Sequence, residues 1–194
     1  MKIVFATANK GKIREASEIL GPGFEVVSPA DLGIFDDIEE TGSTFRENSL
    51  IKAEYISRKT GLDCFADDSG LCVDALGGAP GVHSARYATD GHDFEANIAK
   101  LLAELGDNQQ RKARFRCVVT LLVAGVPHFF EGTCEGSIAF SKAGCGGFGY
   151  DPVFIPDAWP DRTLAELSPD DKNAISHRGQ ALRLMSAWLS DKSR

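Results

Sequence analysis

The chain has 194 residues, of which 43% are hydrophobic and 25% are charged, and its formal net charge is −7. This length suffices for one well-packed α/β domain, and the acidic balance argues against binding to duplex nucleic acid or to an anionic membrane, which both require clustered Lys and Arg. No apolar run approaches the ~20 residues of a membrane-spanning helix. We therefore expect a single cytoplasmic domain over residues 1–194, with any anionic ligand being small.

The first elements are predicted to be a strand, a loop, a helix and a second strand. Lys2 to Ala6 is a short apolar run typical of a buried strand, and apolar residues then recur at helical spacing between Ile13 and Leu20. Phe24 to Val27 predicts the second strand. Residues 28–42 are polar, acidic and rich in turn formers, which predicts a long loop.

A second helix is predicted to begin after Thr44, because Glu47 stands three residues later and completes a capping box. One face of this helix is expected to carry Phe45, Ser49, Ala53 and Ile56. Asn48 and Lys52 lie on a different, polar stripe of the same helix.

The second half of the chain predicts the rest of a mixed sheet. We expect strands at 62–66 and 71–75 on either side of a tight turn, a helix that begins after Asp93, and a hairpin formed by 114–124 and 128–140. Ser168 and Pro169 predict the start of a C-terminal amphipathic helix. The fold class is therefore α/β, with a mixed, elongated central sheet and flanking helices.

The segment TANKGK, from Thr7 to Lys12, lies between the first strand and the first helix. At such a place hydroxyl, amide and backbone N–H groups can face an anion, and two lysines add positive charge. It does not match the P-loop pattern, so the alternative is an ordinary polar turn between a strand and a helix.

The segment FADDSGLC, residues 65–72, places Asp67 and Asp68 side by side between apolar residues, where a charge needs a partner. Neighbouring side chains of an extended chain point to opposite faces, so only one of them can face a given site. A second acidic pair, Glu39 and Glu40, ends the long loop. Carboxylates from two segments suit Mg²⁺, or Mn²⁺ in its place, although a tight turn and a solvated loop are the alternatives.

Two later segments could hold a planar base. In GCGGFGYDP, residues 144–152, glycines allow close approach and Phe148 or Tyr150 could stack on a base, unless these rings pack on the core. In KNAISHRGQ, residues 172–180, the side chains of Lys172, His177 and Arg178 gather where a helix begins. Positive charge there opposes the helix dipole and favours an anion or acceptor-rich ligand; a solvated polar turn is the alternative.

Five segments in this order resemble the inosine/xanthosine triphosphate pyrophosphatases: TANKGK, EETGSTFRENSLIKA, FADDSGLCVDALGGAPGVHSARYA, GGFGYDPVF and KNAISHRGQAL. The resemblance runs from about Ile3 to Trp188, and Ala8 departs from it because many members have Gly or Asn there. It implies two lobes around a substrate cleft and a homodimer. It also implies Mg²⁺-dependent hydrolysis of ITP, dITP and XTP to the monophosphate and pyrophosphate, which keeps these nucleotides out of DNA and RNA.

The resemblance also implies a role for each matching residue. The triphosphate would be held by Thr7, Ala8, Asn9, Lys10, Gly11 and Lys12, with Lys52 as a further contact. Glu40 and Asp68 would bind the metal, and Asp68 would also be the catalytic acid–base residue, with Ser69 touching the substrate beside it. The base would be held by Phe148, Gly149, Tyr150, Asp151, Lys172, His177 and Arg178.

Two other functions stay open. One is a related pyrophosphatase, of the septum-inhibitor-like class, that prefers pyrimidine or methylated nucleotides. The other is a nucleotide-binding sensor that has lost catalysis and works by contacting a partner. A nucleic-acid polymer or a membrane is not expected as a partner in any of these cases.

Overall fold

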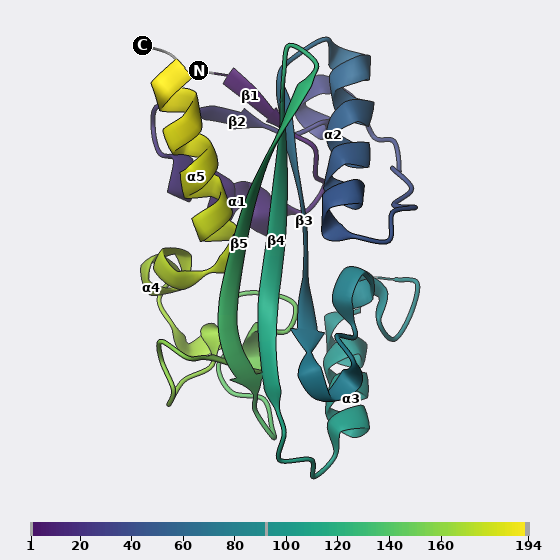
Figure 1. Cartoon of the computed structure of the whole chain (residues 1–194), viewed down its shortest axis with the longest axis vertical. Helices are drawn as coiled ribbons and strands as arrows, with labels where there is room; N and C mark the ends of the chain where they lie inside the picture. Colours follow the sequence, from purple (N-terminus) through teal and green to yellow (C-terminus); the bar gives the residue numbers. More distant parts are fainter. Residues whose placement is uncertain (1, 92, 193–194) are drawn as a thin grey trace. The chain divides into compact units, whose positions relative to one another are not determined.

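The computed structural model describes residues 2–91 and 93–192. Its strands form one sheet in the order β2-β1-β3-β4-β5-β6, with helices beside it (Figure 1). The strands are β1 (Lys2–Phe5), β2 (Glu25–Val27), β3 (Cys64–Val73), β4 (Lys112–Val123), β5 (Val126–Ile138) and β6 (Phe154–Pro156). The α-helices are α1 (Lys10–Leu20), α2 (Phe45–Thr60), α3 (Phe94–Leu105), α4 (Pro169–Ile175) and α5 (His177–Lys192).

The sheet is mixed, as the sequence predicts. β1 pairs in parallel with both of its neighbours, placing Val4 opposite Val27 of β2 and opposite Cys64 of β3. β5 pairs antiparallel with β6, with Ser137 opposite Ile155. The predicted hairpin is confirmed as β4 and β5, which lie inside the sheet between β3 and β6. Within the described residues, none of the helices combines the length and the apolar character that a membrane crossing requires.

The strand order reverses at β1. The chain leaves β1 through α1 to reach β2 on one side, and then passes through α2 to reach β3 on the other side. In sheets of this kind, ligands bind outside the carboxyl ends of the strands at the point where the order reverses. Residues 6–9, which include the first three residues of the TANKGK segment, follow β1 at that point.

The chain forms two compact units. Unit 1 comprises residues up to Asp68 together with 117–132 and the residues from Arg178 onward, and unit 2 comprises 69–116 and 133–177. Strands β3, β4 and β5 each contribute residues to both units.

In unit 1, alternate residues of each strand enter two different hydrophobic clusters. Phe5 and Phe65, whose rings stack with centroids 4.3 Å apart, pack with residues of α1 and α5. Val4 and Cys64 instead pack with Ala53 of α2. Because side chains alternate along a strand, α1 and α5 cover one face of this part of the sheet and α2 covers the other.

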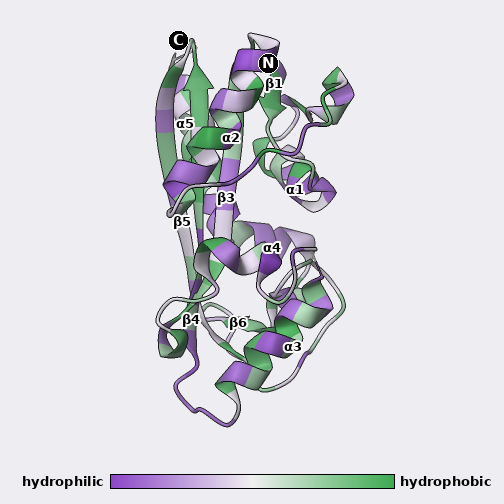
Figure 2. Cartoon of the chain, turned by 90° about the vertical axis from the view of Figure 1, so that its right-hand side faces the viewer, coloured by the Kyte–Doolittle hydropathy of each residue, from purple (hydrophilic) through white to green (hydrophobic). Residues whose placement is uncertain are grey.

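Unit 2 has one hydrophobic cluster of its own. Leu71 and Val73 of β3 pack with Phe115 of β4 and with Ile98 and Leu101 of α3. Figure 2 shows hydrophobic and hydrophilic residues alternating along α3, as expected for a helix with one buried side. The predicted cap is confirmed, since the side chain of Asp93 accepts a hydrogen bond from the backbone of Ala96 at 3.0 Å.

Two predictions about secondary structure are wrong. β3 runs without interruption from Cys64 to Val73, so the expected turn at residues 67–70 does not form. Asp, Ser and Gly favour turns, but here the two carboxylates find cationic partners described below, which removes the cost of keeping them inside a strand. The single C-terminal helix is two helices, α4 and α5, because Ser176 between them is extended with ψ of 148°.

The β4–β5 hairpin closes with a two-residue turn whose residues, Ala124 and Gly125, both have positive φ, at 49° and 78°. This is the pattern of a type I′ turn, in which Asn-Gly is the favoured pair. The left-handed conformation costs alanine about 1 kcal/mol, and Asn tolerates it better. We predict that Ala124→Asn raises the free energy of unfolding by about 0.5–1 kcal/mol in urea titrations. Ala124→Val should lower it, and equal losses in both variants would contradict this account of the turn.

Candidate active site

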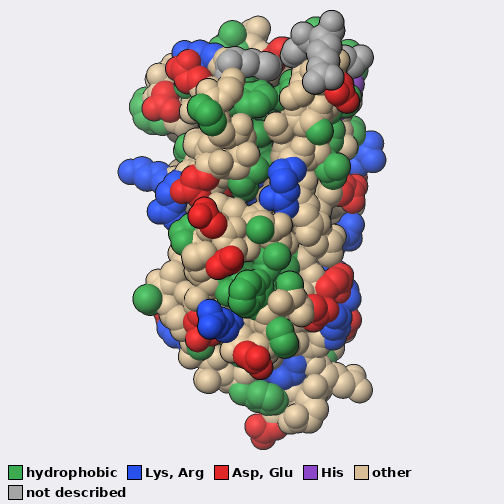
Figure 3. Space-filling view, turned by 90° about the vertical axis from the view of Figure 1, so that its left-hand side faces the viewer, with side chains coloured by type: hydrophobic (Ala, Val, Ile, Leu, Met, Phe, Trp, Pro, Cys, Tyr) green, Lys and Arg blue, Asp and Glu red, His purple; other side chains and the backbone are tan. Residues whose placement is uncertain are grey.

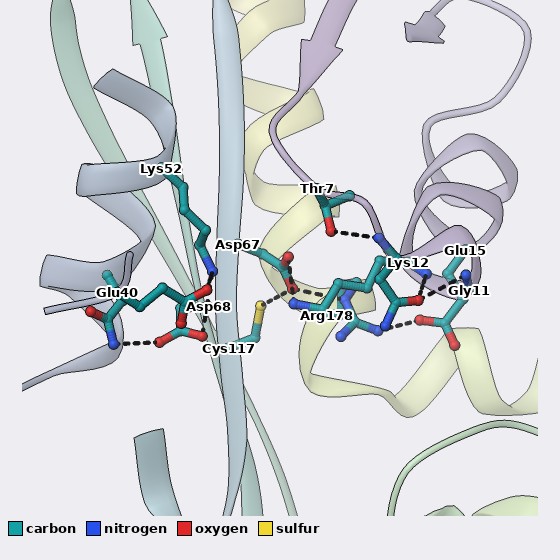
Figure 4. Close-up of polar contacts among 12 residues, drawn as sticks. Thr7, Gly11, Lys12, Glu15, Glu40, Lys52, Asp67, Asp68, Cys117 and Arg178 are labelled. Carbon is teal, nitrogen blue, oxygen red and sulfur yellow. Dashed lines mark hydrogen bonds and ion pairs between the residues drawn. The ribbon is translucent and has the colours of Figure 1, made fainter. Parts of the chain in front are cut away.

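Asp67 and Asp68 lie on opposite faces of β3 (Figure 4). Asp67 has the same orientation as Phe65 and so faces α1 and α5, whereas Asp68 has the same orientation as Ala66 and faces α2. Both side chains are buried. The sequence-based expectation that only one carboxylate can face a given site is therefore confirmed, and each needs partners of its own.

Asp67 lies in a cluster of opposite charges. Lys12 Nζ is 2.8 Å from Asp67 Oδ1, and Arg178 Nε is 3.0 Å from Asp67 Oδ2. Arg178 also donates through Nη1 to Glu15 on α1. Burial by itself would raise the pKa of Asp67, which is only 1% exposed, but the charges of Lys12 and Arg178 outweigh burial and hold this pKa well below its usual range. Asp67 is thus an ionised anchor for two cations.

Asp68 has fewer compensating charges. Asn48 Nδ2 donates to Asp68 Oδ2 at 3.2 Å, and Lys52 Nζ is 3.6 Å from Asp68 Oδ1. The same ammonium donates to Glu40 Oε1 at 2.8 Å. Burial raises the pKa of Asp68 by more than the positive charge of Lys52 lowers it. For Lys52, burial lowers the pKa, but the two carboxylates outweigh burial and the net shift is upward.

These side chains suit a hard divalent cation. Carboxylates from two segments, Glu40 and Asp68, converge on the single ammonium of Lys52, so this point already favours positive charge. No three His, Cys, Asp or Glu side chains gather as a metal cluster within residues 2–91 and 93–192. Mg²⁺ is typically held by one or two carboxylates, with phosphate oxygens and water completing its coordination, and the pair fits that pattern. Glu39, in contrast, is exposed.

The TANKGK segment forms the start of α1. The side-chain oxygen of Asn9 accepts hydrogen bonds from the backbone N–H groups of Gly11 and Lys12 at 2.9 and 3.2 Å, and Thr7 Oγ1 accepts one from Asn9 at 3.2 Å. Lys10 is exposed. Because Asn9 already engages two of the first amides of α1, an arriving phosphate would meet mainly the side chains of this segment.

A second group of predicted residues is connected within unit 2. Asp151 Oδ2 accepts hydrogen bonds from the backbone of Phe148 and from Lys172 Nζ, each at 2.8 Å. Lys172 Nζ also lies 4.8 Å from the centre of the Phe148 ring. Gly147 has φ of 71°, and a Cβ there would be 2.1 Å from Asp151 Oδ2, so this turn requires glycine. Tyr150 is buried in the hydrophobic cluster and donates to the carbonyl of Ser84, which leaves Phe148 as the candidate for stacking.

The predicted site residues are divided between the two units, and His177 and Ser69 belong to unit 2. The His177 ring stacks on Phe115 with centroids 4.8 Å apart, and Ser69 follows Asp68 along β3. Unit 1 holds Thr7 to Lys12, Glu40, Lys52, Asp68 and Arg178. Unit 2 holds Ser69, Phe148 to Asp151, Lys172 and His177. Of the basic residues near the start of the last helix, Lys172 pairs with Asp151, and Arg178 pairs with Asp67 and Glu15.

Sequence reasoning missed two residues that contact this group. Glu15 is a buried acid on α1 that pairs with Arg178, and Asn48 contacts Asp68. Asn48 stands four residues before Lys52 on the polar stripe of α2, so both lie on the same side of the helix. That spacing was the available signal for Asn48.

Comparisons with known proteins agree with the motifs. A family model described as the Ham1 family matches residues 3–188. A protein named dITP/XTP pyrophosphatase from Christiangramia forsetii is 48% identical over 190 residues, which cover 98% of this chain and 100% of the relative. Its namesake from Bacillus subtilis strain 168 is also 48% identical, with 96% of each chain covered. The solved structure of the Staphylococcus aureus Ham1 protein superimposes with a TM-score of 0.88 at 42% identity, covering 99% of this chain and 100% of its own.

We predict that Asp67→Asn lowers the stability of the protein and that Asp68→Asn does not. Asp67→Asn removes the ionised partner of two buried cations and should lower the free energy of unfolding by about 3 kcal/mol. Asp68→Asn removes a carboxylate whose ionisation is disfavoured by burial, so the free energy of unfolding should stay the same or rise by up to about 1 kcal/mol. Urea titrations at pH 7 measure both.

The effect of Asp67→Asn should disappear in acid. Because the pKa of Asp67 is lower in the folded state than in the unfolded state, its stabilisation is fully present above about pH 4 and is lost as the pH falls through the folded-state pKa. The difference between the wild type and this variant should therefore be constant at neutral pH and narrow below about pH 4. Two results would contradict the conclusion that Asp67 is an ionised anchor. One is a difference in free energy of unfolding between the wild type and Asp67→Asn that widens toward low pH, and the other is an equal loss of stability in Asp68→Asn.

Proposed function

Because this chain belongs to the Ham1 family, we propose that it hydrolyses ITP, dITP and XTP to the monophosphate and pyrophosphate, and so keeps these purines out of DNA and RNA. The observation that carries the proposal is the near full-length similarity to proteins named dITP/XTP pyrophosphatase. The convergence of Glu40, Lys52 and Asp68 supplies groups that such a hydrolysis requires. We also propose a cytoplasmic location for the protein, where it would act on free nucleotides.

The triphosphate is assigned to the residues from Thr7 to Lys12 and to Lys52, and Mg²⁺, or Mn²⁺ in its place, is assigned to Glu40 and Asp68. When bound, Mg²⁺ would neutralise phosphate charge as a Lewis acid. The ammonium of Lys52, which already lies beside both carboxylates, would stabilise charge that develops on the phosphate oxygens during the reaction.

Asp68 is assigned as the general base. It would accept a proton from a water molecule whose oxygen forms a bond to the α-phosphorus, while the bond from that phosphorus to the bridging oxygen breaks and pyrophosphate leaves. Proton transfer is most effective when the pKa of the base is closer to the working pH, and burial raises the pKa of Asp68. Asp67, which lies on the other face of β3 with two cations, has a supporting role.

We assign the binding of the purine base of the nucleotide to one group of residues, with Ser69 as a further substrate contact. This group consists of Phe148, Gly149, Tyr150, Asp151, Lys172, His177 and Arg178. Hypoxanthine and xanthine have a 6-oxo acceptor where adenine has a 6-amino donor. A donor such as the Lys172 ammonium, held beside the Phe148 ring, would leave adenine's donor unpaired. Mismatches of this kind discriminate strongly between substrates.

A small nucleotide also suits the charge distribution on the surface. On the face shown in Figure 3, the described Lys and Arg side chains are interspersed with Asp and Glu and do not form one continuous basic patch. A nucleic-acid polymer is bound chiefly through such a patch. Together with the formal net charge of −7, this favours neither a nucleic-acid polymer nor an anionic membrane as a partner.

The reaction is tested by product analysis with Mg²⁺. ITP, dITP and XTP should each yield pyrophosphate and the monophosphate without orthophosphate, with oxygen from labelled water found in the monophosphate. Asp68→Asn should lower kcat by about 10³-fold or more because the base is lost. Asp36→Asn, at an exposed carboxylate paired with Lys59, is the matched control and should leave kcat unchanged.

Other outcomes of the same assay point elsewhere. Turnover of dTTP or UTP equal to that of ITP would favour the pyrimidine-preferring class. Tight binding of ITP without any product would favour a sensor. Full activity in the presence of excess chelator would contradict the assignment of a metal ion to Glu40 and Asp68.

We further propose a homodimer, as the sequence resemblance implies. Unit 1 has large hydrophobic side chains exposed, most of all Phe35 at 82%, and burial of such surface favours association. Light scattering at micromolar concentration should give twice the mass of the chain. A mass equal to that of one chain would contradict this state.

A further inference from the structure

Asn48 connects the two acidic segments of the candidate site. It lies in the first turns of α2 and is only 2% exposed. Its Nδ2 donates to Asp68 Oδ2 at 3.2 Å, and its Oδ1 accepts from the backbone N–H of Gly42 at 2.8 Å. Gly42 stands two residues after Glu40, so a single side chain contacts β3 and the end of the loop that carries Glu40.

The orientation of the Asn48 amide follows from its partners. A backbone N–H can only donate, so Oδ1 must face Gly42, and this leaves the two hydrogens of Nδ2 for the carboxylate. Among uncharged side chains of this size, only an amide offers an acceptor and a donor in these two directions. Because Nδ2 takes Oδ2 of Asp68, it fixes the rotation of the carboxyl group with Oδ1 toward Lys52.

The contact with Gly42 is close on every side. A Cβ on Gly42 would lie 2.6 Å from Asn48 Oδ1 and 2.6 Å from Glu47 Cβ. Contacts below 3.0 Å require a shift of one of the partners, so the loop reaches this position because residue 42 has no side chain. Asn48 and Glu47 therefore both border the path of the chain two residues beyond Glu40, and Asn48 is the one that also contacts Asp68.

The helix itself does not explain this residue. The start of α2 is capped by Thr44 and Glu47, whose reciprocal hydrogen bonds form without Asn48. Asn is a poor helix former, and a buried amide lowers stability unless it is hydrogen-bonded. The two bonds to Asp68 and Gly42 are what keep a buried amide favourable at this position.

We propose that Asn48 is a positioning residue that holds the Asp68 carboxylate and the Glu40 segment in register, so that both carboxylates present oxygen to the same cation. This inference rests on the proposed function. Residues that orient metal-binding carboxylates typically change metal affinity or activity about 10–100-fold when they are replaced.

The central test compares Asn48→Ala with Ser49→Ala. Asn48→Ala should lower kcat about 10–100-fold with KM changed less than about threefold, and should weaken Mn²⁺ binding to the substrate-free protein about tenfold by calorimetry. Ser49 is buried on the same helix and bonds Thr120 Oγ1 at 2.7 Å, so Ser49→Ala also loses a buried hydrogen bond. It should leave kcat and Mn²⁺ affinity within about twofold, since it does not contact Asp68.

A second variant separates the two bonds. Asn48→Asp keeps the acceptor for Gly42 but places a carboxylate against Asp68, so amide exchange of the Gly42 peptide should stay slow. The kcat should nevertheless fall at least as far as in Asn48→Ala.

The positioning role would be overturned if Asn48→Asp kept kcat within twofold of the wild type. It would also be overturned if Ser49→Ala lost as much kcat and Mn²⁺ affinity as Asn48→Ala. An inactive wild type would count against the proposed function instead, and the Mn²⁺ calorimetry of Asn48→Ala would then decide the positioning role by itself: an unchanged affinity overturns it and a tenfold loss supports it.

Discussion

The structure of unit 1 depends on the way β3 carries two adjacent carboxylates through a buried sheet. An unpartnered buried charge is costly, so each carboxylate requires positive charge on its own face of the strand. Lys12 and Arg178 supply it on the side of α1 and α5, and Lys52 supplies it on the side of α2. The three helices around this strand are therefore positioned by charge as well as by apolar packing, and residues far apart in sequence meet at one strand.

The two carboxylates have the same chemistry but different surroundings. Asp67 has two cations within 3.0 Å, and its charge is strongly stabilised. Asp68 has an amide at 3.2 Å and an ammonium at 3.6 Å, and burial dominates its pKa. A carboxylate that is fully compensated is a good structural anion and a poor base, whereas a partly compensated one gains from a metal ion or a proton. The alternation of the strand thus separates a supporting role from a chemical role.

Local signals in the sequence predicted much of this. The capping box at Thr44, the β4–β5 hairpin and the opposite orientations of neighbouring aspartates follow from spacing alone, and five ordered motifs indicated the family. The turn assigned to residues 67–70 failed because turn propensity is a local preference, and partners up to 111 residues away overrode it. The contact between Arg178 and Glu15 spans 163 residues, and no local pattern encodes such a pair.

The polar stripe of α2 has a structural consequence of its own. Lys52 bridges Glu40 and Asp68, and Asn48, one helical turn earlier, bridges Gly42 and Asp68. Both bridges join the same two segments, so a displacement of the loop relative to β3 must break contacts at two successive turns of one rigid helix. Apolar residues at positions 48 and 52 would avoid the cost of burying polar groups. They would, however, remove both contacts that connect Asp68 with the loop that carries Glu40. The burial of Asn48 and Lys52 on α2 therefore serves the site as well as the packing of this helix beside β3.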